Sequence, residues 1–291
     1  MRGLLEFEGS RARSEMENCL LGLYEKSMPI SMGLDEKLKI ASDSGFDFLE
    51  ISIDETEEKL ARLKWSTEEK CDLVNSICRT ALPIKTLCLS AHRKFPIGSV
   101  DTTTRQRGME IMADAIDFAS CLGIRIIQLA GYDCYYEPST ETSRSFFLEN
   151  LKRCAEMAAT KGVLLAFETM ETEFMNTVQK AMHYVQLVDS PYLQIYPDLG
   201  NITNAAMAYG TSVQEDLVAG RGHLVALHLK ESLPGQNREI PYGTGHVDFD
   251  GGIRMAQKLG VGLYLAEFWD TGKEDWRDQI RHAHDFLRSK L

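Results

Sequence analysis

The sequence predicts a single eight-stranded parallel β/α barrel, and three observations lead to this fold class. Short apolar runs with strand character alternate with longer segments of helical period, the pattern of a parallel sheet wrapped by helices. Eight such runs occur in 291 residues without a Pro-, Gly- or Ser-rich linker, which is typical of one closed barrel. No G-x-G-x-x-G turn follows the first run, which disfavours an open dinucleotide-binding sheet.

The predicted strands are apolar runs of strand length, and the predicted helices carry boundary signals. The strands are 19–23, 48–53, 85–89, 126–129, 163–167, 193–196, 225–229 and 263–266. The clearest helices are 34–44, 66–80, 102–122, 141–161, 178–188 and 275–290. The second of these helices opens with the S-T-E-E capping pattern at Ser66. Three of the helices are followed by a glycine, which favours a C-terminal cap.

Composition limits the function classes. The 43 acidic and 32 basic side chains give a net charge of −11, which repels nucleic acid but does not exclude a small phosphorylated substrate. The seven cysteines are scattered and form no C-x-x-C pair, which favours free thiols in a cytoplasmic protein. No apolar run approaches the ~20 residues of a membrane span. We expect residues 1–18 to be a leader or loose arm and residues 19–291 to form the catalytic barrel.

A candidate metal centre is visible at the ends of the last four predicted strands. The apolar runs LLAFE, QIYPD, VALH and LYLAE end on Glu168, Asp198, His228 and Glu267. The C-terminal strand ends of a β/α barrel form its active-site face, so we expect these four side chains to meet. Each alone has a structural reading, such as a helix N-cap. Together, three carboxylates and an imidazole suit a divalent ion such as Zn²⁺, Mn²⁺, Co²⁺ or Mg²⁺.

Two of these ligands, Glu168 and Glu267, come from different strands and are expected to flank the metal. A divalent ion acidifies a C–H next to a carbonyl by stabilising the enediolate. One carboxylate then removes the proton and the other returns a proton on the opposite face. This chemistry inverts a carbon beside a ketone. Near the same mouth, His92 could bond a substrate hydroxyl or be structural, and the role of Glu50 stays open.

Seven stretches outside the ligand set resemble one enzyme family. They are GLYEKSMP, GFDFLEISIDETEEKLARLKW, CLSAHRKFPIGS, IRIIQLAGYDCYY, QIYPDLGN, GHLVALHLKES and PYGTGHVDF. They are similar to the L-ribulose-5-phosphate 3-epimerases, also called L-xylulose-5-phosphate 3-epimerases, of L-ascorbate and pentose catabolism. The similarity extends from about Leu20 to the C-terminus.

The resemblance implies a xylose-isomerase-like barrel with one zinc or manganese ion on the four ligands. It also implies that Glu168 and Glu267 are the acid/base pair, that the substrate is a phosphorylated ketopentose and that the assembly is a homodimer. The related epimerases of free ketohexoses carry a His where this chain has Asn201, and an Arg where it has Pro234. Both differences favour a phosphorylated substrate. The phosphate is expected on Lys230 and Arg238 after the seventh strand, with Arg93 and Lys94 after the third strand as a competing clamp. Asn201 is a further candidate for substrate binding.

Four other functions are alternatives to a sugar-phosphate 3-epimerase. An aldose–ketose isomerase also moves a proton between adjacent carbons with a metal and a carboxylate. A ketose 3-epimerase of unphosphorylated sugars is possible on the same barrel. A phosphodiesterase of the endonuclease IV type needs more metal-binding histidines than the seven in this chain readily supply. A non-catalytic sugar-phosphate sensor would not need an acid/base pair.

Overall fold

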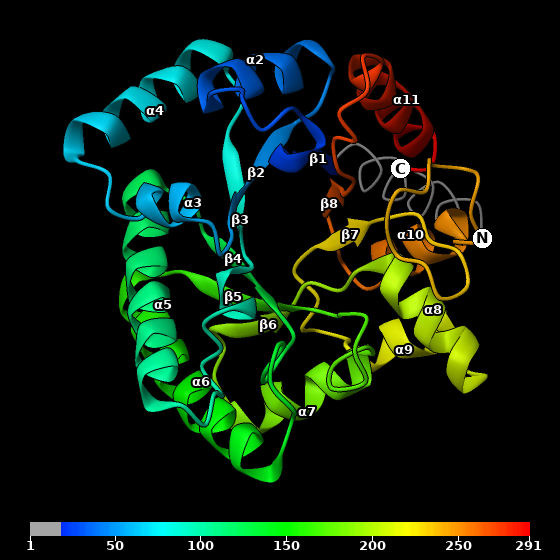
Figure 1. Ribbon diagram of the computed structural model, residues 1–291. Coiled ribbons are helices and arrows are strands. Elements are labelled where there is room, and N and C mark those ends of the chain that lie inside the picture. Colours follow the sequence, from blue (N-terminus) through cyan, green and yellow to red (C-terminus); the bar gives the residue numbers. More distant parts are fainter. Residues whose placement is uncertain (1–18) are drawn as a thin grey trace, which may run out of the picture.

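The computed structural model describes residues 19–291 and confirms the predicted parallel barrel. The predicted leader, residues 1–18, lies outside the described residues. One sheet holds eight parallel strands in the order β6-β5-β4-β3-β2-β1-β8-β7, with the helices around it (Figure 1). The strands are β1 Leu20–Tyr24, β2 Phe48–Ile53, β3 Ile84–Leu89, β4 Ile126–Ala130, β5 Leu164–Glu168, β6 Leu193–Ile195, β7 Leu227–Leu229 and β8 Leu263–Ala266.

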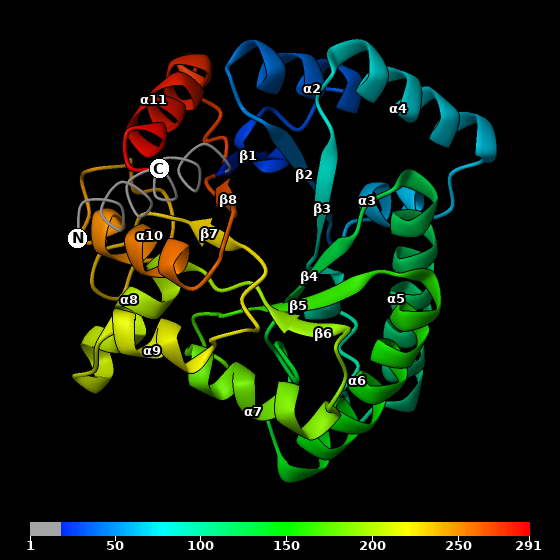
Figure 2. The ribbon, with the colours of Figure 1, turned by 180° about the vertical axis from the view of Figure 1, so that it is seen from behind.

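The barrel closes between β6 and the segment that leads into β7. The Ile195 N–H donates to the His223 carbonyl at 2.9 Å, and the Val225 N–H donates to the Ile195 carbonyl at 3.0 Å. Only two isolated bridges join this seam, at Ile195–Leu224 and Asp198–His228. Seen from behind, β6 and β7 are short compared with β2 and β3 (Figure 2). The seam is therefore the most weakly paired part of the barrel wall.

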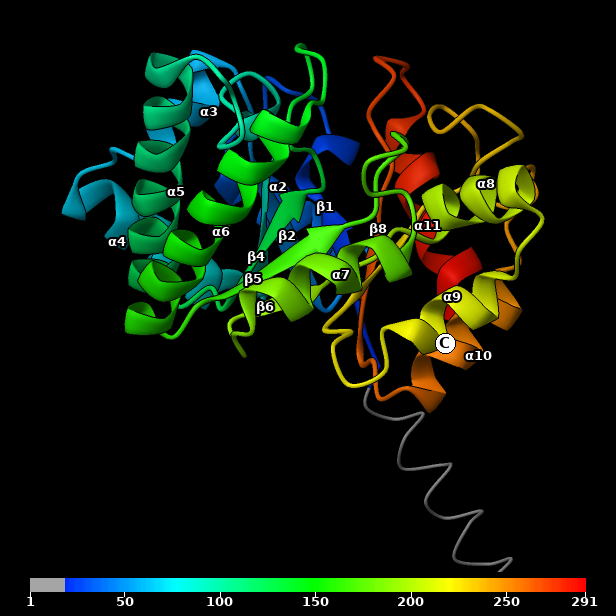
Figure 3. The same ribbon diagram turned by 90° about the horizontal axis from the view of Figure 1, so that it is seen from below.

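The helices alternate with the strands, as predicted. They are α2 Leu34–Asp43, α3 Glu57–Arg62, α4 Thr67–Thr80, α5 Thr102–Leu122, α6 Glu141–Lys161, α7 Val178–Val188, α8 Leu199–Tyr209, α9 Val213–Ala219, α10 Phe249–Lys258 and α11 Trp276–Arg288. The 3₁₀ turns η1 Glu25–Ser27 and η2 Ala91–Arg93 follow β1 and β3. The two longest helices, α5 and α6, lie side by side on one flank (Figure 3). No helix of residues 19–291 is long and apolar enough to cross a membrane.

Side chains alternate between the barrel interior and the helix layer, because successive residues of a strand point to opposite faces. The large core packs between sheet and helices, and a smaller cluster lies inside the barrel. The inner cluster consists of Tyr24, Phe48, Cys88, Ile126, Ala166, Tyr196, Ala226 and Leu265. At Gly22, an added Cβ would lie 2.3 Å from the Phe48 ring. A glycine on β1 thus makes room for this ring in the interior.

Candidate metal centre

The same alternation carries polar side chains into the upper part of the barrel. Ala166 and Leu265 belong to the inner cluster, so Glu168 and Glu267, two residues further along, point to the same side. On β7 the inward position after Ala226 is His228. Asp198 comes three residues after β6 ends at Ile195. All four predicted ligands therefore lie at the end of the barrel where the strands have their C-terminal residues.

The four predicted ligands form one cluster in the structure. A ligand atom from each of Glu168, Asp198, His228 and Glu267 lies within 4.8 Å of the other three, and all four residues are buried. Asp198 and His228 are fully buried, at 0% exposure. Asp198 Oδ2, His228 Nδ1 and Glu267 Oε2 have no hydrogen-bond partner. Lys230 Nζ is paired with the two carboxylate oxygens, at 3.1 Å from Asp198 Oδ2 and 3.4 Å from Glu267 Oε2. Three carboxylates and an imidazole are donors that fit a divalent ion.

Asp198 is also the N-cap residue of α8. Its Oδ1 accepts a hydrogen bond of 2.6 Å from the Asn201 N–H. The Asp198 N–H in turn donates to Thr169 Oγ1 at 2.9 Å. These bonds fix the carboxylate and leave Oδ2 directed at the cluster. The helix-capping reading and the ligand reading are therefore compatible, because each uses a different oxygen.

Neighbouring side chains orient the other ligands. The Gln128 amide of β4 donates to Glu168 Oε2. The His228 Nδ1 atom lies 3.6 Å from Glu168 Oε1 and 3.2 Å from Glu267 Oε2. The Tyr196 ring packs edge-on against the imidazole, with ring centroids 4.5 Å apart. The imidazole is thus held with Nδ1 facing the carboxylates.

Crowding of these groups shifts their proton affinities. Burial, reinforced by the charge of Glu267, raises the pKa of Glu168. Burial raises the pKa of Asp198 well above its usual range, although Lys230 opposes this. Glu267 has the opposite shift: Lys230 and His228 outweigh its burial and lower its pKa. The two glutamates therefore differ in proton affinity.

Glu50 on β2 is a contributor whose role the sequence left open. Its Oε1 lies 3.2 Å from His228 Nε2, on the side of the ring opposite the cluster. Its Oε2 accepts a hydrogen bond of 2.7 Å from Thr86 Oγ1 on β3. Burial alone would lower the pKa of His228, but Glu267 and Glu50 outweigh it and raise this pKa well above its usual value. The only sequence signal for Glu50 is a charge at an inward position of an apolar strand.

A pocket of 520 Å³ opens above the cluster at the mouth of the barrel. Glu168 and Glu267 line it, and so do four of the residues proposed for substrate binding: Arg93, Asn201, Lys230 and Arg238. Lys26 after β1 is a further cation of this wall that was not predicted from the sequence. Its Nζ pairs with Asp54 at 2.6 Å.

The cations of the pocket differ in their surroundings. Lys230 Nζ is buried beside the cluster, 3.1 Å from Asp198 Oδ2 and 3.4 Å from Glu267 Oε2. Arg93 and Arg238 form no salt bridge with any carboxylate of residues 19–291 and stack on aromatic rings instead. The Arg93 guanidinium lies 4.9 Å from the Tyr135 ring centre, and that of Arg238 lies 4.8 Å from the Trp269 ring centre. The two arginines are therefore available to an anion.

His92 is placed differently from the expectation. It is buried, does not line the pocket, and its Nε2 lies 3.0 Å from the Gly108 carbonyl oxygen of α5. Burial lowers the pKa of His92 to about 4, so the ring is neutral at pH 7 and donates this hydrogen bond. A structural role for His92 explains these contacts, because the hydrogen bond from its ring links η2 to α5. We therefore do not retain it as a substrate ligand.

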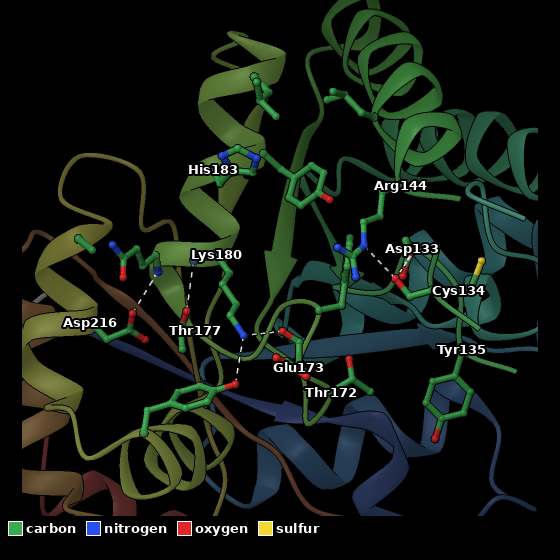
Figure 4. A pocket seen from close by; sticks show the side chains of 18 of the residues that line it. Asp133, Cys134, Tyr135, Arg144, Thr172, Glu173, Thr177, Lys180, His183 and Asp216 are labelled. Atoms are coloured by element: carbon green, nitrogen blue, oxygen red, sulfur yellow. Dashed lines mark hydrogen bonds between the residues drawn. The ribbon is translucent and has the colours of Figure 1, made fainter. Parts of the chain in front are cut away.

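A larger hollow of 1510 Å³ lies outside the barrel between α6, α7 and α9 (Figure 4). Lys180 occupies its centre, where Nζ donates to the Glu173 carbonyl at 2.5 Å and to the Tyr209 hydroxyl at 3.1 Å. None of the four cluster residues lines this hollow, and it shares only Tyr135 with the mouth pocket. The chemistry of the predicted ligand set therefore makes the smaller pocket the candidate active site.

The fold and site define a class of protein. Residues 38–290 match the family model of the xylose isomerase-like TIM barrel, so the chain belongs to that family. Among solved structures, D-psicose 3-epimerase from Clostridium cellulolyticum H10 has a TM-score of 0.77 at 17% identity over 94% of this chain and 99% of that one. An L-ribulose 3-epimerase has a TM-score of 0.74 at 19% identity, with 94% of each chain covered. These likenesses establish the fold.

Relatives with higher sequence identity define the family more specifically. The L-ribulose-5-phosphate 3-epimerases UlaE of Shigella boydii serotype 18 and of Escherichia coli strain SE11 are each 43% identical to this chain. Each match covers 93% of this chain and 94% of the relative. The chain belongs to the L-ribulose-5-phosphate 3-epimerase family and is a carbohydrate epimerase. The family resemblance seen in the sequence is confirmed.

Proposed function

We propose that this protein is a metal-dependent 3-epimerase that interconverts L-xylulose 5-phosphate and L-ribulose 5-phosphate. The observation that carries the proposal is the buried cluster of four ligand atoms within 4.8 Å of one another, with two of its glutamates lining the mouth pocket. Relatives 43% identical to this chain are L-ribulose-5-phosphate 3-epimerases. A role in L-ascorbate and pentose catabolism and a homodimeric assembly remain predictions from the resemblance, and a cytoplasmic location remains a prediction from the scattered cysteines.

Glu168, Asp198, His228 and Glu267 would hold the ion, and Zn²⁺ or Mn²⁺ is the proposed metal. Their oxygen and imidazole donors also accept Co²⁺ or Mg²⁺. When bound, the ion stabilises the negative charge that develops on a ketose when a C–H beside its carbonyl is ionised. The convergence of one buried ligand atom from each of the four residues within 4.8 Å supports this assignment.

Proton transfer at C3 is proposed for the two glutamates. The carboxylate of one removes the C3 proton, and the carboxyl group of the other delivers a proton to the opposite face of the carbon. Burial raises the pKa of Glu168, whereas Lys230 and His228 lower that of Glu267, so the two carboxyl groups have different surroundings. Because epimerisation is reversible, the two residues exchange roles with direction. Lys230 lies beside Glu267 and Asp198, where its charge favours the anionic carboxylates.

The substrate phosphate is proposed to bind to arginine at the rim. Arg93 has a buried Nε without a hydrogen-bond partner and a guanidinium fixed over Tyr135. A planar guanidinium can bind phosphate through two parallel hydrogen bonds. Arg238 is the exposed alternative, and Asn201 has a buried, unpartnered Oδ1 on the same pocket wall. The burial of Lys230 within the carboxylate cluster favours a role near the reacting carbons.

The experiment that tests the function is proton NMR of the enzyme with L-xylulose 5-phosphate in deuterated water. We expect deuterium at C3 together with the appearance of L-ribulose 5-phosphate. Glu168→Gln and Glu267→Gln should each abolish conversion to the second epimer, because an amide can neither take nor return the proton. The variant that lacks the base facing the C3 proton of L-xylulose 5-phosphate should also lose the exchange. Glu171→Gln is a matched control, since Glu171 lines the same pocket outside the ligand set. Full C3 exchange in both active-site variants would refute the acid/base assignment.

The same spectrum separates the competing functions. Deuterium at C2 of an aldose product, with deuterium at C1 of the remaining ketose, would identify an aldose–ketose isomerase. Equal turnover of free L-ribulose would identify an epimerase of unphosphorylated sugars. The endonuclease IV reading has less support, because residues 19–291 contain one metal-type cluster and His228 is its single histidine.

A further inference from the structure

Glu50 is a buried carboxylate at the centre of the barrel that the proposed chemistry does not use. It lies on β2, and β1 and β8 separate this strand from β7 in the sheet. Glu50 therefore reaches His228 across the barrel interior, where both side chains are 0% exposed. Its Oε1 is 3.2 Å from His228 Nε2, and neither atom has a hydrogen-bond partner elsewhere.

This charge is unusual for its position. Barrel interiors are filled mainly by Val, Ile and Leu, and burial of an unpaired carboxylate is strongly unfavourable. Within residues 19–291, no Lys or Arg forms a salt bridge with Glu50, and His228 is its one ionic contact. Thr86 donates to its second oxygen at 2.7 Å and so fixes the plane of the carboxylate. The contact with the imidazole therefore accounts for a charge at this position.

The orientation of the imidazole gives this contact a chemical consequence. His228 Nδ1 faces Glu168 and Glu267, at 3.6 Å and 3.2 Å, while Nε2 faces Glu50. A ring nitrogen that binds a metal carries no proton, so a neutral His228 must keep its proton on Nε2. A carboxylate at Nε2 selects this tautomer, fixes the ring plane and makes Nδ1 a stronger donor.

We propose that Glu50 is a positioning residue of the metal centre, which acts through His228 on metal affinity and not on the substrate. The inference rests on the proposed metal site but not on the identity of the sugar. In this proposal, a chain of contacts runs from Thr86 on β3 through Glu50 on β2 to the proposed ligand His228 on β7. Loss of such an outer partner weakens metal binding by about 10–100-fold in other metalloproteins.

The test is a Co²⁺ titration of the chelator-treated, metal-free protein, followed by visible absorption and by competition with a chelator of known affinity. Glu50→Gln keeps the size of the side chain and removes its charge. We expect the dissociation constant for Co²⁺ to rise about 10–100-fold and the absorption bands of bound Co²⁺ to shift. Glu171→Gln, a carboxylate variant of the same pocket, should leave both unchanged. Thr86→Val, which frees the second oxygen of Glu50, should weaken binding in the same direction by less.

The proposal would be overturned if Glu50→Gln bound Co²⁺ with the same affinity and the same absorption spectrum as the unaltered protein. A purely structural role would lower the thermal stability of the metal-free variant while leaving its Co²⁺ affinity unchanged, and this result would also overturn it. If Glu50→Gln does not fold, Thr86→Val decides, and unchanged affinity there counts against this chain of contacts. Because the titration does not measure turnover, a protein that binds Co²⁺ as expected but lacks 3-epimerase activity would refute only the proposed function.

Discussion

The residues of the centre differ in how far the sequence could reveal them. Glu168 and Glu267 were predictable because each ends an apolar strand that carries no other charge. Glu50 could not be assigned, because its partner His228 lies across the barrel and no sequence spacing encodes that pairing. Lys230 was expected at the phosphate, whereas the structure buries it beside Asp198. Side chains near the C-terminal ends of the strands all lie at the same mouth of the barrel. How deeply each one is buried there depends on the register of the folded sheet.

Arg93 offers a prediction about substrate recognition. Arg93→Gln should raise KM for L-ribulose 5-phosphate by about 10-fold or more and leave the KM for free L-ribulose unchanged, because a charged hydrogen-bond donor contributes about 1.5–3 kcal/mol. Steady-state kinetics with both sugars check this. Lys94→Gln is the matched control, since Lys94 is exposed and does not line the pocket. An equal change for both sugars, or a selective loss in Arg238→Gln alone, would assign the phosphate elsewhere.

At the scale of elements, the sequence predicted best where a local signal marks a boundary. The helices α5, α6 and α7 have the predicted bounds, and a glycine with positive φ follows α5 at Gly123 and α6 at Gly162. The helices α3, α8, α9 and α10 were not named. In α8, the N-cap is Asp198, for which the sequence offered a helix cap as the alternative to a metal ligand. The predicted strand 193–196 ends at Ile195, because Pro197 has no N–H to continue the ladder.

The cap of α4 gives an element-scale test. Ser66 Oγ accepts from the Glu69 N–H, and the Glu69 carboxylate accepts from the Ser66 N–H. Ser66→Ala should lower the free energy of unfolding by ~1 kcal/mol, or Tm by about 2–4 °C. Thermal unfolding followed by circular dichroism measures this change. Ser66→Thr retains the hydroxyl and should recover most of the stability, and turnover should not change in either variant.

The contact between η2 and α5 predicts a pH effect. The buried His92 has a pKa of about 4, below the ~6.5 of an unfolded histidine. The unfolded chain therefore binds this proton first as the pH falls. The contribution is intact above pH 6.5 and is lost between pH 6.5 and about 4, by at most ~3 kcal/mol. His92→Gln retains a donor toward Gly108 and should lose less stability than the parent over this range. Parallel stability–pH curves for the two proteins would contradict the assignment.

At the scale of the whole molecule, the metal centre lies across the seam of the barrel. The wall is continuous from β6 through β1 to β7, and only two isolated bridges join β6 to the β7 segment. One of these bridges, Asp198–His228, joins two of the four ligands. The other two ligands, Glu168 and Glu267, come from the strands next to the seam. A sequence predicts eight strands but not which pair is weakest, since that depends on how the ring closes.

This placement predicts that the bound ion stabilises the closed barrel. A ligand at 100 times its dissociation constant adds ~2.7 kcal/mol to the free energy of unfolding, so chelation should lower Tm by about 5–10 °C. Amide exchange should show where the stability is lost. Chelation should speed exchange in β6 and β7 more than in β2 and β3, which pair along their full length on the far side of the barrel. His228→Ala should bind less metal by elemental analysis and should not respond to chelation. Uniform acceleration of exchange over all strands would show that the ion does not act through the seam.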